Sequence, residues 1–396
     1  MSLTLNSPMA LCRYLIVHHR TIPRIARTFF DNTLVYLFNK KPSRGPLFVA
    51  WTVTYRCNAQ CSFCDTHELG RALHRDLDTE EALKLIRQIG AAGVWHLSLT
   101  GGEPLIRQDL EQLIRESKRV GLIVNINTNG SLLAKKAEML VDAGVDMITV
   151  SVDSHKSEVH DASRVLPGLT QGIIDGIERV KSLRNKKLPE IAVRIVVSKQ
   201  NYQDIGNIIS MFRNKADRIS LQPIHDGYDV PKFTNSKNQK KTGLLNLDDK
   251  DPFVFAPEER GEFATAFNKL VNKYSWLNTP VYREFENFFF DKDFMWEKYH
   301  CYAGFYDLTL NAFGQAFTCP FLIQSIGTIR KDSLMTMWMN SSARAWRRKL
   351  KNKQNTCLCW CGTAQNNAYL DPLLNPPVAR VISSMLNRFK KSESIR

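Results

Sequence analysis

Three cysteines lie within eight residues of this chain, in the run Cys57-Asn-Ala-Gln-Cys61-Ser-Phe-Cys64. The loops of three and two residues between them can fold back and bring the three thiols to one metal centre. A mononuclear zinc site needs a fourth ligand close by, for which His67 is a candidate. Iron–sulfur clusters are held by Cys thiolates, and a cube with three protein thiolates leaves one iron open. The spacing therefore predicts either a zinc site or a cluster with an open iron.

A glycine pair follows the second β-like run of the chain. Residues 47–55 and 95–100 are apolar and rich in β-branched and aromatic side chains, which predicts strands. The second run leads into Gly101-Gly102-Glu103-Pro104. Glycine lets the backbone approach a ligand closely, and the carboxylate of Glu103 can pair with an ammonium group. We therefore expect a ligand-binding turn after this strand.

Together these two motifs resemble those of the radical S-adenosylmethionine superfamily. The Cys-x3-Cys-x2-Cys spacing with an aromatic residue before the third cysteine is similar to the cluster motif of that family, and the glycine pair is similar to its GGEP motif. The resemblance implies a [4Fe–4S] cluster whose open iron chelates S-adenosylmethionine, held by Cys57, Cys61 and Cys64. It further implies that the amino group of the methionyl moiety is bound at Gly101, Gly102 and Glu103, and that Phe63 packs by the adenine.

Strands and helices are expected to alternate from residue 47 to about residue 225. The pattern predicts strands at 47–54, 95–100, 122–127, 146–151, 191–197 and 218–223. It predicts helices at 79–91, 109–119, 131–143, 170–185 and 202–213. Alternating βα units predict an α/β fold with a parallel sheet, and the resemblance implies a partial (βα)6 barrel of the radical SAM type. By analogy with closed barrels, we expect the chemistry at the carboxyl ends of the strands.

Polar residues at other strand ends fit the same rim. The resemblance implies ribose contacts from the ends of the third and fourth strands, and a contact with the methionyl carboxylate from the fifth. The matching positions are Thr128, Asn129, Ser151 and Asp153 at the strand ends and Arg194, which lies within the fifth strand and not on the rim. Taken singly, each polar residue is explained equally well by turn chemistry or capping. The sequence assigns no catalytic residue.

A second group of cysteines lies near the C-terminus, at Cys301, Cys319, Cys357, Cys359 and Cys361. The sequence predicts a hairpin over 301–319 with its turn at 311–314, and then a helix near 332–352. This group resembles the auxiliary-cluster extension called SPASM, or its shorter twitch form. A full SPASM extension carries more cysteines, so the resemblance implies one auxiliary [4Fe–4S] cluster in a small α+β domain at 301–365. We expect its ligands to be Cys301, Cys319, Cys357 and Cys361, with Cys359 as the alternative fourth ligand and zinc as the alternative metal.

The net charge of +15 is confined to the two ends of the chain. Residues 1–46 hold seven Lys or Arg and one acidic residue, whereas residues 326–396 hold thirteen and three. Both ends place apolar residues at helical spacing, which predicts a basic amphipathic arm at 1–46 and a basic amphipathic helix within 366–396. Such segments can lie on an anionic membrane, and the alternative is that they pack against the core. Between the domains, 226–300 is a connecting region.

The composition indicates a protein of a reducing compartment. Nine cysteines, eight of them in two motif-like groups, suit metal binding better than disulfides. No apolar run approaches the ~20 residues that span a bilayer, and the first residues lack the pattern of a signal peptide. We therefore expect a cytoplasmic protein whose basic ends favour peripheral contact with the inner face of the membrane.

The resemblance implies an enzyme that reductively cleaves S-adenosylmethionine to a 5′-deoxyadenosyl radical, which abstracts hydrogen from a substrate C–H. It implies flavodoxin or ferredoxin as the electron donor. The basic ends and the aromatic residues at 285–302 favour a lipid or lipid-linked substrate at a membrane surface. The alternatives are a maturase of a ribosomally made peptide and a non-enzymatic zinc protein. Nucleic acid is disfavoured as a partner because the chain carries no recognised motif for it.

Overall fold

The computed structural model describes residues 22–64, 66–68, 76–185, 187–224, 253, 255–291, 301–320 and 324–352. The first part of the expected basic arm, most of the connecting region and the whole C-terminal helix lie outside these residues. So do Cys357, Cys359 and Cys361. The two motifs that carry the radical SAM resemblance both lie inside them.

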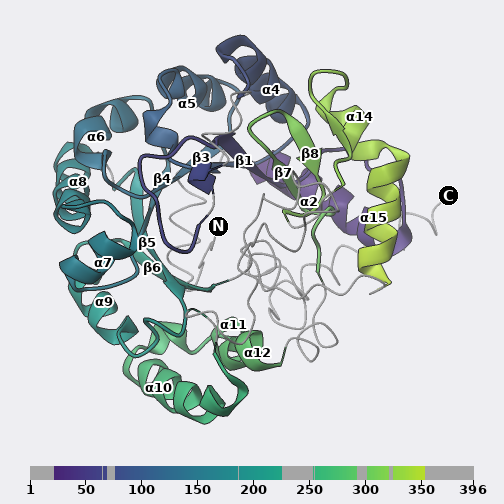
Figure 1. The fold of residues 1–396 in the computed structure, drawn as a ribbon. Coiled ribbons are helices and arrows are strands. Elements are labelled where there is room, and N and C mark those ends of the chain that lie inside the picture. The colour runs from purple at the N-terminus through teal and green to yellow at the C-terminus, as the bar shows by residue number, and fades with distance from the viewer. Residues whose placement is uncertain are drawn as a thin grey trace.

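Six parallel strands form the first part of one curved sheet (Figure 1). They are β1 (Phe48–Thr54), β2 (His96–Gly101), β3 (Ile123–Thr128), β4 (Met147–Ser151), β5 (Glu190–Val197) and β6 (Arg218–Pro223). The helices between and after them are α4 (Thr79–Ala91), α5 (Leu110–Arg119), α6 (Leu133–Asp142), α7 (Ser157–Ser163), α8 (Leu169–Leu183) and α9 (Ile205–Phe212). The expected alternation is confirmed, and only the short α7 in this series was not expected.

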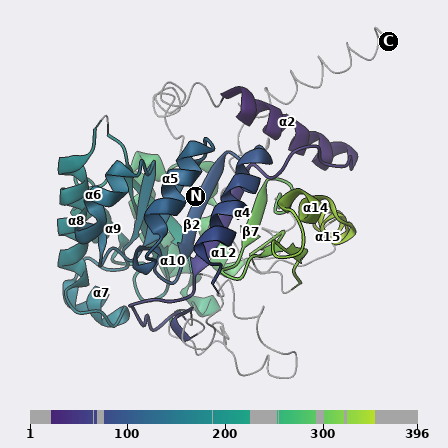
Figure 2. The same ribbon diagram turned by 90° about the horizontal axis from the view of Figure 1, so that it is seen from above.

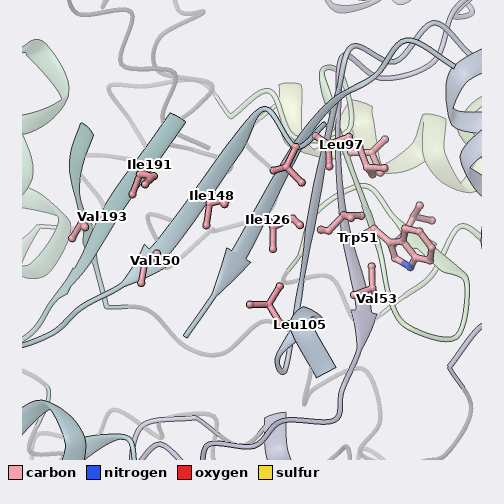
Figure 3. Packing of buried hydrophobic residues seen from close by; sticks show 14 of the residues in the cluster. Trp51, Val53, Leu97, Leu105, Ile126, Ile148, Val150, Ile191 and Val193 are labelled. Atoms are coloured by element: carbon pink, nitrogen blue, oxygen red, sulfur yellow. The ribbon is translucent and has the colours of Figure 1, made fainter. Parts of the chain in front are cut away.

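The outer face of this sheet is apolar and covered by helices. Alternate residues along the strands, such as Val49, Trp51 and Val53 of β1, belong to one hydrophobic core with the buried faces of the helices. Figure 3 shows Leu97, Ile126, Ile148, Val150, Ile191 and Val193 of the neighbouring strands in the same layer. Successive side chains of a strand point to opposite faces, so the residues between them line the inner face.

The inner face is polar across the middle of the sheet. Ser98, Asn125 and Asn127 on β2 and β3 alternate with the core residues, as does Thr149 on β4. The Asn127 side-chain amide donates to Ser98 Oγ (2.8 Å), and Thr149 Oγ1 donates to Asn125 Oδ1 (3.0 Å). Closed parallel barrels usually fill this space with bulky branched residues. The inner face of this sheet instead presents hydrogen-bonding groups.

The expected hairpin near the second cysteine group is confirmed, and it also continues the main sheet. The strands are β7 (Asp307–Leu310), β8 (Gln315–Phe317) and β9 (Gly327–Thr328). β7 pairs in parallel with β1, and the sheet order is β6-β5-β4-β3-β2-β1-β7-β8-β9. The expected helix near 332–352 is broken at Asn340 into α14 (Leu334–Met339) and α15 (Ser341–Lys351). The described members of the second cysteine group, Cys301 and Cys319, therefore flank strands added at the edge of the same sheet.

The described part of the connecting region forms an aromatic core. It contains α10 (Arg260–Lys273), α11 (Pro280–Arg283) and α12 (Phe285–Phe290), with short 3-10 turns at Pro257–Glu259 and Ser275–Leu277. Phe267 stacks on Phe285 with ring centroids 4.9 Å apart, and Phe285 is fully buried. These rings stabilise the fold by burial of apolar area.

Helix α2 (Ile22–Phe38) closes the end of the sheet away from the cysteine loop (Figure 2). Its Val35 packs with Leu47 and Trp95, which directly precede β1 and β2, and with Ile123, the first residue of β3. The Arg24 guanidinium donates to the carbonyl oxygens of three residues at the ends of α4 and α5, namely Gly90, Val94 and Val120. One apolar side of the expected basic arm is thus covered by the protein itself, as the core-packing alternative stated. Within the described residues, none of the helices is long and apolar enough to cross a membrane.

Candidate functional site

The cysteine loop leaves the carboxyl end of β1 and is held by the glycine pair after β2. The backbone N–H of Gly102 donates to the Thr54 carbonyl and that of Glu103 to the Arg56 carbonyl, both at 2.9 Å. A Cβ atom on Gly101 would lie 2.2 Å from Thr54 O, and one on Gly102 would lie 2.1 Å from Arg56 O. Only glycine permits this approach. The glycine pair therefore fixes the segment from which the cysteine loop starts.

Glu103 ties this segment to the end of β3. Its carboxylate is fully buried and accepts hydrogen bonds from Thr128 Oγ1 (2.8 Å) and from the backbone N–H groups of Asn129 (2.7 Å) and Leu105 (3.0 Å). Burial raises the pKa of Glu103 to about 7, against the lowering effect of these three donors. The expected site residues Glu103, Thr128 and Asn129 are thus brought together, and they bind one another. Their contacts with S-adenosylmethionine stay predictions.

Asn58, inside the cysteine loop, adds a side-chain connection to the same strand end. The Asn129 amide donates to Asn58 Oδ1, and the Asn58 amide donates to Ser131 Oγ, both at 2.9 Å. The backbone N–H of Ser131 donates to Asn129 Oδ1 at 2.9 Å. Sequence analysis missed Asn58, because an Asn in a loop is ordinary turn chemistry.

The end of α7 holds the other side of the cysteine loop. The backbone N–H of Gln60 donates to the Arg164 carbonyl (3.2 Å), and that of Ser62 donates to the Ser163 carbonyl (2.9 Å). The Arg164 guanidinium donates to Asp153 Oδ2 at 2.5 and 3.0 Å, and it lies over the Phe63 ring at 5.4 Å from the centroid. These contacts attach the loop to the expected site residue Asp153 at the end of β4.

Arg164 is the clearest site residue that sequence analysis missed. Its side chain is almost fully buried, and its charge acts on Cys61 and Cys64. In the sequence, Asp153 and Arg164 stand on either side of a short, mostly polar stretch. This arrangement indicates an ion pair only once helix α7 is known to lie between them. In addition to the expected Arg194, which lies within β5, the site therefore has a second arginine near the cysteine loop.

A hollow of about 490 Å³, partly open to solvent, lies beside the cysteine loop. It is bounded by the carboxyl ends of β4, β5 and β6. The lining residues are Phe63, Asp153, Ser154, Val159, Ser163, Val196, Ser198, Gln200, Asn201, Asp204, Ile224 and Phe253. Two expected site residues, Phe63 and Asp153, face it together. Its mixture of aromatic, apolar and hydroxyl groups suits a nucleoside, which has a flat ring and a polar sugar.

Ser151 and Arg194 lie side by side but on the inner face of the sheet. They are register partners on β4 and β5, and the residues before and after Arg194 belong to the outer core. Both are half-buried. Unlike Asp153, the other expected residue of the β4 end, they are not among the residues that line the hollow beside Phe63.

The three thiols of the cysteine loop are free and half-buried. Burial raises the pKa of Cys57 to about 11 and that of Cys61 to about 12, partly offset at both by the positive charge of Arg164. Among the described residues, no three His, Cys, Asp or Glu side chains stand as close together as the ligands of a single metal ion. Ligands of a cluster bind different irons and stand farther apart. An all-thiol donor set beside a buried cation fits an iron–sulfur cluster.

The second cysteine group is described for two of its expected four ligands. Cys301 is half-buried and Cys319 is 8 % exposed, and neither forms a disulfide with another described residue. They pack in one cluster with Ala303 and with Trp346 and Leu350 of α15. The structure therefore brings these two expected ligands together, whereas Cys357, Cys359 and Cys361 lie outside the described residues.

A parallel α/β sheet with a three-thiol loop on its carboxyl rim defines a cluster-binding protein of the partial-barrel class. The family model of the radical SAM superfamily matches residues 51–212, and that of the SPASM iron–sulfur cluster-binding domain matches residues 301–362. The chain belongs to the radical SAM superfamily and carries a SPASM domain after its core. These domains imply a [4Fe–4S] cluster, S-adenosylmethionine and an auxiliary iron–sulfur cluster.

Among curated proteins, the chain is similar to the AdoMet-dependent heme synthase of Methanosarcina barkeri (strain Fusaro / DSM 804). The two are 35% identical over 164 residues, which is 41% of this chain and 46% of that protein. The GTP 3′,8-cyclase of Limosilactobacillus fermentum (strain NBRC 3956 / LMG 18251) is 36% identical over 145 residues, covering 36% of this chain and 43% of that one. The chain thus matches less than half the length of either relative.

Among solved structures, Streptococcus suis SuiB bound to precursor peptide SuiA superposes with a TM-score of 0.58. The alignment covers 84% of this chain and 74% of that chain, at 18% sequence identity. The likeness confirms the expected fold across the core and the segment that follows it.

Replacing Gly102 with Ala tests the role of the glycine pair. The added Cβ would lie 2.1 Å from the Arg56 carbonyl, so the start of the cysteine loop has to move. We expect Gly102→Ala to lose the core cluster, which lowers the iron and sulfide of reconstituted protein by roughly half if two [4Fe–4S] clusters are present. Gly261→Ala is the matched control, because nothing lies within 4 Å of its added Cβ. Full iron content in Gly102→Ala would contradict this role.

Proposed function

We propose that this protein is a radical SAM enzyme that abstracts a hydrogen atom from a carbon of its substrate. The observation that supports this most strongly is the joining of the cysteine loop to three neighbouring strand ends. Backbone bonds attach it to the β2 end, Asn58 attaches it to the β3 end, and Ser163 and Arg164 attach it to the segment after β4. Such a rim would hold the cluster and S-adenosylmethionine at a fixed position relative to each other. In cofactor enzymes, this positioning is the contribution of the protein.

The residues at this rim would have different roles. Cys57, Cys61 and Cys64 would hold the cluster, and the Gly101–Glu103 segment would face the amino group of S-adenosylmethionine. Phe63 and Asp153 would face its adenosine in the hollow that they line. When bound and reduced by a flavodoxin or ferredoxin, the cluster and S-adenosylmethionine supply a carbon radical that can abstract hydrogen.

Further expected contacts belong to the same proposal. Thr128, Asn129 and Ser151 would contribute polar groups around the ribose. The methionyl carboxylate has two candidate cations. Arg194 lies on the inner face, and Arg164 packs on Phe63 beside the thiols. The second cysteine group would hold one auxiliary [4Fe–4S] cluster through Cys301, Cys319, Cys357 and Cys361.

The inner face of the sheet favours a substrate whose reacting part is polar. Ser98, Asn125, Asn127 and Thr149 form a hydrogen-bonded group across β2, β3 and β4. These groups partly satisfy one another, but an acyl chain placed against them would leave their remaining donors and acceptors without partners in a dehydrated site, which is unfavourable. Amides and hydroxyls match them. We therefore place a peptide substrate ahead of the lipid tail that the sequence alone favoured.

Our second candidate function is action at a membrane surface, and an exposed patch at the end of α2 favours it. Leu37 and Phe38 are 37% and 53% exposed at the end of α2, followed by the exposed Lys40 and Lys41. Lys351 of α15 donates to the Leu37 carbonyl, so the basic last turn of α15 lies beside them. Exposed apolar residues ringed by cations match an anionic bilayer. A lipid-linked substrate with a polar head would suit both this patch and the inner face.

Deoxyadenosine release tests the proposed chemistry. Reduced protein with S-adenosylmethionine should form 5′-deoxyadenosine and methionine, and the triple change Cys57→Ala, Cys61→Ala, Cys64→Ala should abolish both. The double variant Cys301→Ala, Cys319→Ala should still cleave S-adenosylmethionine, because its core thiols are intact. If wild-type protein with intact clusters releases no deoxyadenosine under dithionite, the protein is a binding protein and the proposal is wrong.

Liposome sedimentation tests the membrane candidate. Full-length protein should sediment with anionic vesicles at low salt and less at high salt, because salt screens the attraction of lysines to anionic lipid. The change Leu37→Ser, Phe38→Ser should lower the bound fraction severalfold. Val165→Ser is the matched control, since Val165 is 54% exposed but lies beside the cysteine loop at the other end. Equal sedimentation of the wild type and both variants would show that Leu37 and Phe38 do not form a membrane-binding surface.

A further inference from the structure

Helix α15 carries a buried arginine on the same face as Leu350, which packs with Cys319. Asn340 caps the helix by accepting from the backbone N–H of Ala343 at 2.8 Å. Ala343, Arg347 and Leu350 are buried at helical spacing, whereas Arg344 and Arg348 on the same helix are exposed. Arginine is rarely fully buried unless it is paired. The burial of Arg347 therefore needs an explanation, whereas the exposed cations of α15 need none.

The Arg347 guanidinium is held by carbonyl groups and an aromatic ring. Nε donates to the Gly304 carbonyl at 2.5 Å and Nη2 to the Trp338 carbonyl at 2.8 Å. The guanidinium lies 4.1 Å from the centre of the Trp338 ring. Nη1 is buried and has no hydrogen-bond partner among the described residues. These contacts fix the position of the charge but supply no negative charge.

No carboxylate pairs with Arg347 in the part of the chain that the structure describes. Its side chain is 3% exposed, and the one charge that acts on it is the positive charge of Arg344. Burial lowers the pKa of Arg347 to about 9, which leaves it protonated at neutral pH. An isolated buried charge is strongly unfavourable, and buried charges are normally paired or bound to a counter-ion. Within the described part of the chain, this guanidinium therefore has no anionic partner.

The segments that carry Cys301 and Cys319 lie next to this arginine. Gly304, whose carbonyl Arg347 binds, is three residues after Cys301. A Cβ on Gly304 would lie 2.8 Å from Cβ of Thr318, the residue before Cys319. On the other side of Arg347, Trp346 and Leu350 pack in one cluster with both cysteines. The cation thus lies among the elements that position Cys301 and Cys319.

We propose that Arg347 is the counter-cation of the auxiliary iron–sulfur cluster. A [4Fe–4S] cluster with four thiolate ligands carries a net negative charge, and its reduction by one electron adds another. A nearby buried cation favours the reduced form and raises the reduction potential, since net charge and hydrogen bonding at the site set that potential. Arg347 is a positioning residue, because it acts on the cluster's charge and on the Gly304 carbonyl. The inference rests on the auxiliary cluster of the proposed function and is independent of the substrate.

Redox titration followed by electron paramagnetic resonance tests this inference. Arg347→Gln removes the charge and retains an amide donor, whereas Arg347→Lys keeps the charge. We expect Arg347→Gln to shift the midpoint potential of the auxiliary cluster to a more negative value, and Arg347→Lys to shift it much less. The core cluster should keep its potential in both variants. Arg348→Gln is the matched control, because it removes the same charge from an exposed position on the same helix.

An unchanged auxiliary potential in Arg347→Gln would overturn the inference and leave Arg347 a structural clamp. If Arg347→Gln fails to retain the auxiliary cluster, the iron content of the two Arg347 variants distinguishes a role of the charge from a role of the hydrogen bond. Retention in Arg347→Lys supports the counter-cation, whereas equal loss in both variants shows that the bond to the Gly304 carbonyl matters and the charge does not. Absence of any auxiliary signal in wild-type protein would instead refute the proposed cluster at Cys301 and Cys319, a failure that these variants do not produce.

Discussion

The backbone pairing between Gly102–Glu103 and Thr54–Arg56 is the constraint on which the site depends. Two hydrogen bonds of 2.9 Å join the segment after β2 to the start of the cysteine loop, at a distance that excludes any Cβ on either glycine. Each such bond contributes only about 1 kcal/mol to stability. Their importance is positional, because parallel pairing of β1 with β2 delivers the three thiols to the rim where the other strand ends meet.

The two sites of this protein differ in how their buried charges are compensated. At the rim, the carboxylate of Glu103 accepts three hydrogen bonds, and Asp153 is paired with Arg164. Both anions are compensated within the chain, so the rim is organised before any ligand binds. At the second cysteine group, Arg347 has carbonyl partners but no anion among the described residues. We interpret the rim as preorganised for S-adenosylmethionine and the second group as incomplete without a negatively charged cluster.

The fold of the core was predictable because its signals are local and strong. The apolar, β-branched runs predicted all six strands to within one residue at either end, and α4 spans the expected residues 79–91. The three thiols and the glycine pair were equally visible. What the sequence did not reveal depends on tertiary contacts. Neither the pairing of Arg164 with Asp153 nor the parallel pairing of β7 with β1 has a local pattern. The basic arm shows the same limit, since its apolar side predicts a membrane and a core contact equally well until Val35 is seen to be buried.

Electron paramagnetic resonance of the core cluster tests the central claim most directly. The double variant Cys301→Ala, Cys319→Ala, reduced with dithionite, should show the signal of the cluster on Cys57, Cys61 and Cys64 alone. If the rim binds S-adenosylmethionine at an open iron, adding it should shift the g values of that signal, and S-adenosylhomocysteine should not reproduce the same spectrum. A spectrum that S-adenosylmethionine leaves unchanged would contradict the account, because cluster and ligand would then not share one site.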